Sequence, residues 1–388
     1  MRILSILGVL CVAFGAVGSA SETPATEQAV LPLPFCYFEN LYLDTRQETF
    51  YTVGEAAEPA LAVRNVVGRQ VHMKKMVELQ KPVEVLADTT LLLFETPQTN
   101  GYLAHFFHLL EHLVGVWSFY ADAHQEEIKR VVLVDGPFVN RPWQGPNQIN
   151  KHLLNALFPQ AEVMAWDNFL NKQRGQTIRF ERALTSDRAL TFQNLECKKI
   201  NKMLGAARTS LSSSALDRLA EQVQKYAKCS MVKDPKYLHV TYAKRPPPRR
   251  LSPRLEAKMI AALSKIPNVK LRTIDFAEMT FNEQIQTVST TNVLVSVHGN
   301  GLSHLLFLPP NSCVIEIFPP DTLLLDYRLF ANARQFEYHG IVANQGSVSD
   351  EDAYAGMACN NVNFPVEQLN INALVDIVRK RVIAHRQR

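Results

Sequence analysis

The sequence predicts an α/β protein with two domains, and two observations carry that prediction. Short apolar runs rich in β-branched residues alternate with amphipathic helical stretches through the second half of the chain. The 388 residues are 47% hydrophobic and 20% charged, so the chain is globular and long enough for two cores. The net charge of +4 is small for this length and indicates no nucleic-acid partner.

The elements of the second half follow one another in a regular order. Strands alternate there with helices long enough to cross back over a sheet, which gives βαβ units and a parallel sheet. The second half therefore predicts a doubly wound, Rossmann-like domain, closed by a last helix over residues 366–384. The predicted strands cover residues 236–242, 269–274, 293–297 and 313–318, and the predicted helices cover 252–264, 280–289 and a short segment from Leu302.

The first half mixes helical patterns with fewer clear strands, of which residues 130–135 and 161–166 are the best. An amphipathic stretch over residues 213–228 leads to Asp234-Pro235, and proline disfavours helix at the residue before it. We therefore expect a domain boundary at this dipeptide. The predicted domains are an N-terminal α/β domain over residues 21–233 and the Rossmann-like domain over 234–388.

Residues 1–20 have the pattern of a secretory signal. Arg2 precedes an apolar run over residues 3–17, and the small residues Gly18 and Ala20 suit a cleavage point. A retained signal-anchor is the alternative, although the apolar stretch is barely long enough to span a bilayer. Either way we expect the rest of the chain in the lumen of the endoplasmic reticulum or Golgi, or secreted. It would contact the membrane only if the segment is retained.

Five cysteines remain once the signal is removed, in a compartment that permits disulfides. Because five is odd, at least one thiol stays free or pairs between chains. Cys313 lies in the apolar run CVIEIF and is the candidate for a buried free thiol, whereas Cys197 and Cys229 are the candidate bridge. The sequence has no C-x-x-C pair, which argues against a structural zinc ribbon.

The segment 292–319 holds the most informative pattern of the chain. A buried strand ends at His298, the turn Gly299-Asn300-Gly301 follows, and a helix begins directly after it. Ligands of an open parallel sheet bind at the carboxyl ends of its strands. Glycines let the backbone approach a phosphate closely, and the unpaired N–H groups at a helix start attract anions. An ordinary strand-to-helix turn is the alternative, but the pattern favours a diphosphate site.

Charged residues near this turn strengthen the hypothesis. Glu316 stands inside an apolar strand, where an unpaired carboxylate is costly to bury, so it either binds the hydroxyls of a ribose or forms a satisfied ion pair. Lys244, Arg245, Arg249 and Arg250 follow the strand at 236–242 and reach the same sheet edge. Guanidinium groups bind phosphate through two parallel hydrogen bonds. For Arg249 a solvated proline-rich loop is an equal alternative.

Three motifs in this region resemble glycosyltransferase family 61. They are His298-Gly-Asn-Gly-Leu302, Phe307-Leu-Pro-Pro310 and Val314-Ile-Glu-Ile317. In the first of them an asparagine replaces the alanine that is usual in the family. The spacing of Arg245 and Arg250 and the pair Glu283-Gln284 also match the family's pattern.

The resemblance implies a GT-B fold, in which two Rossmann-like domains with parallel sheets face each other across a cleft. It implies an inverting transfer of GlcNAc or xylose from a UDP-sugar to a hydroxyl of a glycoprotein or glycan. In such a fold arginines and a helix N-terminus stabilise the leaving UDP, so neither a divalent metal nor another cofactor is expected. The implied donor-binding residues are Arg245, Arg250, His298, Gly299, Asn300, Gly301, Leu302, Ser303, His304 and Glu316.

The stretch HFFHLLEH at 105–112 contains the H-x-x-E-H pattern of one class of zinc peptidases. As a helix over residues 104–118, it places His105, His108, Glu111 and His112 in one polar stripe, and most other positions are apolar. A helix of this kind is mostly buried. We expect its stripe to face a wet cleft.

Three interpretations of the stripe stay open. The resemblance places a histidine and an acidic residue on the acceptor side of the cleft, which makes His105, His108 and Glu111 the candidates for the general base. A zinc site would use His108 and His112, with Glu181 as a third ligand. In the third interpretation the histidines only form hydrogen bonds across the domain interface.

Other patterns bear on the remaining function classes. Asp350-Glu351-Asp352 is the chain's one D-x-D pattern, and its polar surroundings indicate a solvated acidic turn rather than a metal site. An esterase could use His-Gly-x-Gly after a strand, but it also needs a G-x-S-x-G turn, and the sequence has none. A non-catalytic lumenal protein that binds a nucleotide stays open as an alternative to the enzyme.

Overall fold

The computed structural model describes elements throughout both halves of the chain. The described residues are 30–31, 36–47, 49–53, 65–66, 69–70, 72–76, 83–94, 105–123, 128–134, 149–186, 208–209, 213–230, 236–247, 250–319, 326–343, 346–348 and 366–387. The predicted signal, Cys197, Arg249 and residues 350–352 lie outside them. The chain divides into two compact units, Met1–Ala25 with Pro32–Thr191 and Thr26–Leu31 with Phe192–Arg388.

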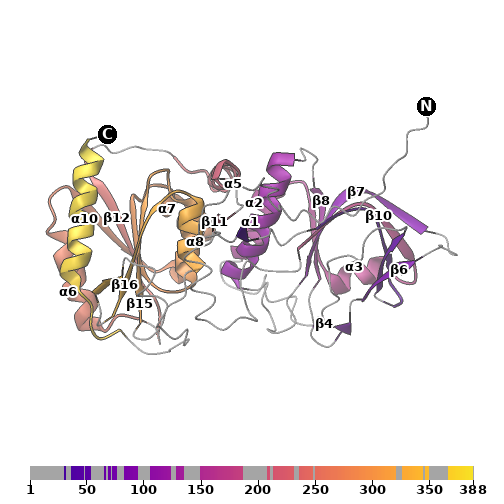
Figure 1. Ribbon diagram of the computed structural model, residues 1–388, viewed down its shortest axis with the longest axis horizontal. Helices are drawn as coiled ribbons and strands as arrows, with labels where there is room; N and C mark the ends of the chain where they lie inside the picture. The colour runs from indigo at the N-terminus through magenta and orange to yellow at the C-terminus, as the bar shows by residue number, and fades with distance from the viewer. Residues whose placement is uncertain are drawn as a thin grey trace, which may run out of the picture. The chain divides into compact units, whose positions relative to one another are not determined.

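The first unit contains a seven-stranded sheet with the order β6-β3-β2-β10-β7-β8-β9. Figure 1 labels β6, β7, β8 and β10 of this sheet. Strands β10, β7, β8 and β9 run parallel, whereas β2 is antiparallel to both β10 and β3. The sheet is therefore mixed, and the prediction of a parallel sheet in this domain was wrong on the β2 side. Only residues 45–48 join β2 to β3, and a parallel crossover needs a much longer connection.

The strands of this sheet are β2 (Cys36–Asp44), β3 (Thr49–Val53), β6 (His72–Met76), β7 (Val83–Phe94), β8 (Ile128–Val134), β9 (Glu162–Ala165) and β10 (Thr177–Ser186). Helices α1 (Phe106–Ala123), α2 (Ile149–Leu157) and α3 (Trp166–Lys172) belong to the same unit. The predicted strands at 130–135 and 161–166 are confirmed as β8 and β9. Two-residue strands pair elsewhere, β1 (Val30–Leu31) with β11 (Arg208–Thr209) and β4 (Asn65–Val66) with β5 (Arg69–Gln70).

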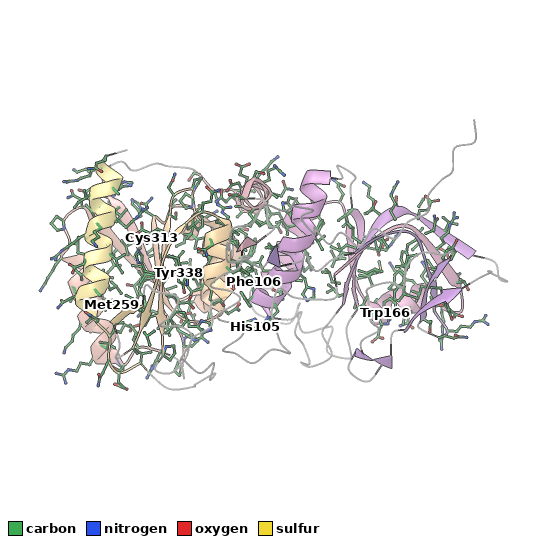
Figure 2. The ribbon with its side chains drawn as sticks, viewed as in Figure 1. His105, Phe106, Trp166, Met259, Cys313 and Tyr338 are labelled. Atoms are coloured by element: carbon green, nitrogen blue, oxygen red, sulfur yellow. The ribbon has the colours of Figure 1, made fainter. Side chains whose placement is uncertain are left out.

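Aromatic side chains fill the core of the first unit. Trp166 stacks on Phe50 and on Phe169, with ring centroids 5.9 and 5.8 Å apart, and Phe169 stacks on Phe180 at 5.9 Å. Trp166 is labelled in Figure 2. All four side chains are buried. Burial of an aromatic side chain contributes about 2 kcal/mol by removing apolar surface from water. This cluster therefore holds α3 against the sheet.

The second unit contains a six-stranded sheet with the order β13-β12-β14-β15-β16-β17. All strands but β17 run parallel. Its strands are β12 (Leu238–Ala243), β13 (Val269–Ile274), β14 (Val293–Val297), β15 (Cys313–Phe318), β16 (Glu337–Val342) and β17 (Gly346–Val348). The predicted strands at 269–274, 293–297 and 313–318 are confirmed residue for residue. Strand β16 escaped prediction because Glu337, His339 and Gly340 interrupt its apolar pattern.

Helices cover both faces of this sheet, with α6 and α10 on one face and α7 and α8 on the other (Figure 1). The predicted doubly wound domain is therefore confirmed. Its helices are α5 (Ser213–Tyr226), α6 (Pro253–Ser264), α7 (Phe281–Ser289), α8 (Asp326–Ala333) and α10 (Ile371–Arg386), with 3₁₀ helices η3 (Phe276–Glu278) and η4 (Asn300–Phe307).

Local sequence explains where these helices begin. Pro253 occupies the first turn of α6, a position that needs no N–H donor. Thr280 and Glu283 form a capping box at the start of α7. The side chain of Asn370 accepts a hydrogen bond from the backbone N–H of Ala373 at 3.0 Å, so α10 begins later than predicted.

Helix α5 belongs to the second unit rather than to the first. It packs against α7 and η4, and its buried face consists of Leu216, Leu219 and Val223 with two alanines. The division between the units therefore falls between Thr191 and Phe192, and it differs from the boundary predicted at Asp234. Helix α5 ends at Tyr226, and Pro235 itself lies outside the described residues.

Two described cysteines are free thiols. Cys313 is buried in β15, as predicted. The predicted bridge between Cys197 and Cys229 was wrong, since the Cys229 thiol is free and forms a hydrogen bond with Ser289 of α7. Partial burial raises the pKa of the Cys229 thiol. Within the described residues, no helix has both the length and the apolar character needed to cross a bilayer.

Candidate functional site

The strand order of the second sheet identifies one edge as the place for a ligand. The chain leaves β12 toward β13 on one side and returns to β14 on the other, so β12 and β14 are neighbours with connections in opposite directions. Such a switch point leaves a crevice outside the carboxyl ends of the two strands, where ligands of α/β sheets bind. Arg245 follows the end of β12, and His298-Gly-Asn-Gly follows the end of β14.

Gly299 and Arg245 meet at this switch point. Gly299 has φ 146° and ψ −174°, a backbone conformation that is open almost only to glycine. A Cβ atom at this position would lie 1.1 Å from Nη1 and 2.1 Å from Cζ of Arg245. The guanidinium group therefore occupies the space that any other residue would fill with its side chain. The predicted arginine and the predicted glycine turn come together in one small site.

Helix η4 continues directly from this glycine. The Leu302 N–H donates to the Gly299 carbonyl oxygen at 2.9 Å, and the Ser303 hydroxyl donates to Oδ1 of Asn300 at 3.3 Å. Leu302 and Ser303 are buried, so these two predicted donor-binding residues support the turn from inside. At Gly301 a Cβ would lie 3.3 Å from Cδ2 of Phe276, which is tight but not impossible.

His304 is part of the support beneath the turn. Its Nε2 lies 2.7 Å from Oε1 of Gln284, its Nδ1 lies 3.0 Å from the Gly301 carbonyl oxygen, and its ring stacks on Phe276 at 3.9 Å. Burial lowers the pKa of His304 to about 4. The side-chain amide of Gln284 donates to the carbonyl oxygens of Phe276 and Met279, which fixes its orientation. His304 therefore contacts the turn and not solvent.

Glu316 lies in the interior rather than at the open edge. Its side chain is fully buried, with Oε1 2.5 Å from Nδ1 of His298 and Oε2 accepting a 2.5 Å hydrogen bond from the Tyr338 hydroxyl. Of the two roles considered for Glu316, the satisfied pair is therefore confirmed. The expectation that it binds a ribose was wrong, because both carboxylate oxygens are engaged. Tyr338 could not be predicted, since the strand that carries it was not.

The other predicted basic residue, Arg250, differs from Arg245 in its surroundings. Arg250 is exposed, whereas Arg245 is half-buried. Lys244 is exposed as well, with its Nζ 4.0 Å from Glu256. Among the basic residues described at this edge, Arg245 is thus the one that the fold holds against the glycine turn.

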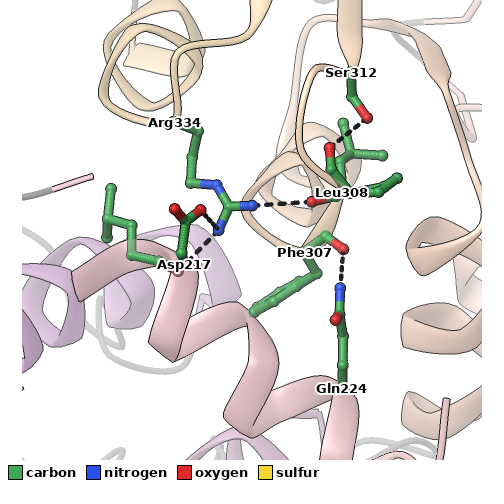
Figure 3. A network of polar contacts seen from close by, with 8 residues as sticks. Asp217, Gln224, Phe307, Leu308, Ser312 and Arg334 are labelled. Carbon is green, nitrogen blue, oxygen red and sulfur yellow. Dashed lines mark hydrogen bonds and ion pairs between the residues drawn. The ribbon is translucent and has the colours of Figure 1, made fainter. Parts of the chain in front are cut away.

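A network of polar contacts fixes the far end of η4 (Figure 3). The Gln224 side chain on α5 donates to the Phe307 carbonyl oxygen at 2.8 Å. Arg334 donates to the carbonyl oxygens of Leu308 at 3.0 Å and Leu216 at 2.8 Å, and it pairs with Asp217 at 3.3 Å. The bonds to Phe307 and Leu308 satisfy carbonyl groups that a helix leaves without partners at its end. The carboxyl end of η4 is therefore held by α5 and by Arg334, which follows α8.

Helix α1 of the first unit carries the other predicted site. His105 is exposed, His108 is half-buried and His112 is fully buried (His105 and Phe106 are labelled in Figure 2). Glu111 lies on the same helix, but its side chain is outside the described part of the structure. The predicted apolar positions are buried, whereas His112 was wrongly placed in a wet stripe. Of the three histidines, His105 and His108 are the two whose side chains are partly exposed.

Charge on His108 is disfavoured by its surroundings. Burial, followed by the neighbouring His105 and His112, lowers its pKa to about 3. Its ring centroid is 4.7 Å from that of His105. His108 is therefore neutral near pH 7, and it is a weak proton acceptor.

The zinc interpretation of this helix finds no support among the described side chains. Within that part of the chain, the one group of three metal-donor side chains that comes together is Cys313, Glu337 and His339. This group lies at the amino ends of β15 and β16, and Arg381 already donates to Glu337 at 2.8 Å. His108, His112 and Glu181 do not form such a group.

Comparison with known proteins decides the family. The model of glycosyltransferase family 61 matches residues 105–315, which is more than half of the chain. The chain belongs to glycosyltransferase family 61. The matched range contains both α1 and the glycine turn after β14.

Individual relatives of this family member are distant. Protein O-linked-mannose β-1,4-N-acetylglucosaminyltransferase 2 of Takifugu rubripes is 34% identical over 90 residues, which are 22% of this chain and 15% of the relative. The EGF domain-specific O-linked N-acetylglucosamine transferase of Drosophila melanogaster is 25% identical over 136 residues, which are 34% of this chain and 26% of the relative. The family member thus matches only a minor part of each relative's length.

One solved structure is similar along nearly the whole family member. It is the dodecameric iron-containing heptosyltransferase TibC in complex with ADP-D-β-D-heptose, at 13% identity over 94% of this chain and 98% of that chain. The TM-score of 0.35 is too low to support an argument about the fold.

Proposed function

We propose that the protein is a glycosyltransferase that moves a sugar from a UDP-sugar to a hydroxyl group of a glycoprotein or glycan. The observation that carries the proposal is the Arg245 guanidinium lying against the Gly299 backbone at the switch point of the second sheet. A guanidinium and an adjacent helix start are the groups that recognise a diphosphate. Both matched relatives are named as N-acetylglucosamine transferases, which favours GlcNAc over xylose as the sugar.

In the proposed reaction the acceptor oxygen attacks the anomeric carbon from the face opposite to UDP, so the configuration inverts. The bond from the sugar to the β-phosphate breaks, and the negative charge on the leaving UDP grows. Arg245 and the N–H groups at the start of η4 would stabilise that charge. Because this charge comes from the protein, we propose that no divalent metal and no other cofactor is needed.

A general base on α1 would take the proton from the acceptor hydroxyl. Near neutral pH, His108 is a weak acceptor, because its pKa is lowered to about 3. His105 and Glu111 are the better candidates for this role. A GT-B arrangement of the two units, and a place in the lumen of the endoplasmic reticulum or Golgi, belong to the same proposal.

Thermal unfolding in the presence of nucleotides tests this function. A ligand that binds the folded state raises the melting temperature, so we would compare UDP, GDP, UDP-GlcNAc, UDP-xylose and UDP-galactose, each with EDTA. We expect UDP and one UDP-sugar to stabilise the protein, and that UDP-sugar to support transfer without metal. Stabilisation by GDP alone would overturn the donor assignment. Turnover that EDTA abolishes and Mn²⁺ restores would overturn metal independence.

Stabilisation by UDP without hydrolysis or transfer of any UDP-sugar would favour a different function. The protein would then be a lumenal nucleotide-binding protein that keeps the family's pocket without its chemistry. A panel of hydroxyl acceptors, including O-mannosyl peptides and EGF domains, makes this outcome decisive, since the two matched relatives are named for such substrates.

A further inference from the structure

A chain of three polar side chains, of which Tyr338 is half-buried and the other two are buried, runs across the second sheet toward the ligand edge. Tyr338 lies on β16, Glu316 on β15, and His298 directly after β14. The Tyr338 hydroxyl and His298 Nδ1 each approach a different carboxylate oxygen of Glu316, both at 2.5 Å. Glu316 is 0% and His298 5% exposed. The chain therefore connects a residue in the sheet interior with a residue at the switch point.

This arrangement is costly if it serves only to hold the fold together. A carboxylate loses several kcal/mol of hydration on burial, and an apolar pair of the same size often stabilises a core equally well. The residues of β15 on either side of Glu316 are buried and apolar. The carboxylate is thus an exception in an otherwise apolar strand. The bond from Tyr338 fixes the carboxylate of Glu316, and the carboxylate in turn fixes the orientation of the His298 ring.

The surroundings of His298 fix the ring in one orientation. Nδ1 points at Glu316, so Nε2 points away from it. The ring stacks on Phe318 at 5.6 Å and meets the edge of Tyr327 at 5.5 Å. Within the part of the chain that is described, Nε2 has no hydrogen-bond partner. One nitrogen is therefore held by the protein while the other is left for a ligand next to Gly299.

We propose that Glu316 and Tyr338 are positioning residues that aim the Nε2–H of His298 at a phosphate oxygen of the bound nucleotide. A phosphate oxygen accepts a hydrogen bond, so Nε2 must be the donor, and the Glu316 carboxylate at Nδ1 keeps the other ring nitrogen turned away from the ligand. The Tyr338 hydroxyl holds the second carboxylate oxygen and so fixes the direction of the first. This inference rests on the proposed function, because it needs a diphosphate at the switch point. No bond is made or broken by these residues.

Binding of UDP and of uridine to three variants tests the inference. Tyr338→Phe removes one hydroxyl group, and Glu316→Gln keeps the shape but removes the charge. We expect Tyr338→Phe to weaken UDP binding about fivefold, because it removes one of the two bonds that hold the carboxylate. We expect Glu316→Gln to weaken UDP binding about tenfold or more, because it removes the charge that assists both bonds. Uridine, which lacks phosphates, should bind each variant as it binds the wild type. A loss that affects UDP and uridine equally would contradict the inference.

Tyr242→Phe is the matched control. The Tyr242 hydroxyl donates to Glu256 at 2.9 Å, and Tyr242 belongs to the buried core beneath α6 and α10. It is the same kind of pair in the same unit, without a histidine at its end. We expect Tyr242→Phe to lower the melting temperature as Tyr338→Phe does, with the UDP-to-uridine affinity ratio unchanged. An equal fall of that ratio in both variants would overturn the inference.

Nitrogen NMR of ¹⁵N-histidine-labelled protein supplies a second readout. We expect UDP to shift the Nε2 resonance of His298 in the wild type and to shift it less in Glu316→Gln, where the ring is no longer held by a carboxylate. If Glu316→Gln fails to fold, Tyr338→Phe decides alone through the affinity ratio. Failure of wild type to bind UDP would overturn the proposed function. Wild-type UDP binding with unchanged ratios in both variants would overturn only this inference.

Discussion

Helix α1 and the turn after β14 each carry clustered histidines, but the structure surrounds them differently. On α1 the three histidines range from exposed to fully buried, although the helical wheel places them on one stripe. At the turn, His298 and His304 each have a named side-chain partner, Glu316 and Gln284. The residues at the turn hold one another in place through these contacts, whereas the residues on α1 are candidates for the general base.

The difference lies in what each sequence pattern constrains. A glycine that must adopt φ 146° permits one backbone path, and the residues around it are placed by that path. A helical stripe fixes only which residues share a side of the helix. How much of that side is covered depends on neighbouring elements, which the stripe itself does not specify.

Substitution of the two glycines in the turn gives the largest expected effect. Gly299→Ala forces a side chain into a positive-φ position and into the Arg245 guanidinium, so we expect UDP affinity to fall about 100-fold. Gly301→Ala meets only the edge of Phe276 at 3.3 Å, a side chain that can shift, so we expect a loss of a few-fold. Isothermal titration calorimetry measures both. Equal losses would mean that Arg245 and Gly299 are not the centre of the site.

Conservative changes of the two arginines give the next effect. Lysine keeps the charge but not the planar fork, so Arg245→Lys should weaken UDP about tenfold. Arg250 is exposed, and Arg250→Lys should change the affinity less than about threefold. The same titration distinguishes them. A larger loss for Arg250→Lys would move the phosphate site outward from the switch point.

The last effect concerns the stability contributed by α1. His108 is neutral in the folded protein down to pH about 3, whereas in the unfolded chain it takes up a proton below its ordinary value of 6.5. The unfolded state therefore binds more protons between these values, and the free energy of unfolding falls as the pH drops through this range. We expect wild type to lose about 2 kcal/mol more than His108→Gln between about pH 7 and about pH 5.

Urea unfolding of both proteins at the two pH values measures this difference. Parallel losses would show that His108 is not held neutral by the fold. In that case His108 would again be a candidate for the general base, beside His105 and Glu111.

Much of the second unit could be predicted from sequence because its strands are continuous apolar runs. β13, β14 and β15 were placed residue for residue, and the meeting of Arg245 with Gly299 follows from parallel strands ending at one edge. Strand β16 could not be found, since polar residues and a glycine interrupt it. Tyr338 was therefore missed as a partner of Glu316, although a satisfied pair was one of the two roles considered for that carboxylate.

The fold of the first unit was harder to predict from sequence, and the reason is physical. Its sheet depends on pairings between distant segments, such as β2 with β10, and strand direction depends on connections rather than on composition. The burial of His112 was missed for the same reason, since the neighbours of α1, β10 and α2, come from other parts of the chain.

The central claim is that the switch point between β12 and β14 binds the diphosphate of a UDP-sugar without metal. Titration of the wild-type protein with UDP, UMP and uridine in the presence of EDTA tests it most directly. We predict that UDP binds about tenfold tighter than UMP, and UMP tighter than uridine, because each phosphate adds charge-assisted bonds to Arg245 and the turn. Equal affinities for UDP and uridine, or UDP binding only after Mn²⁺ is added, would contradict it.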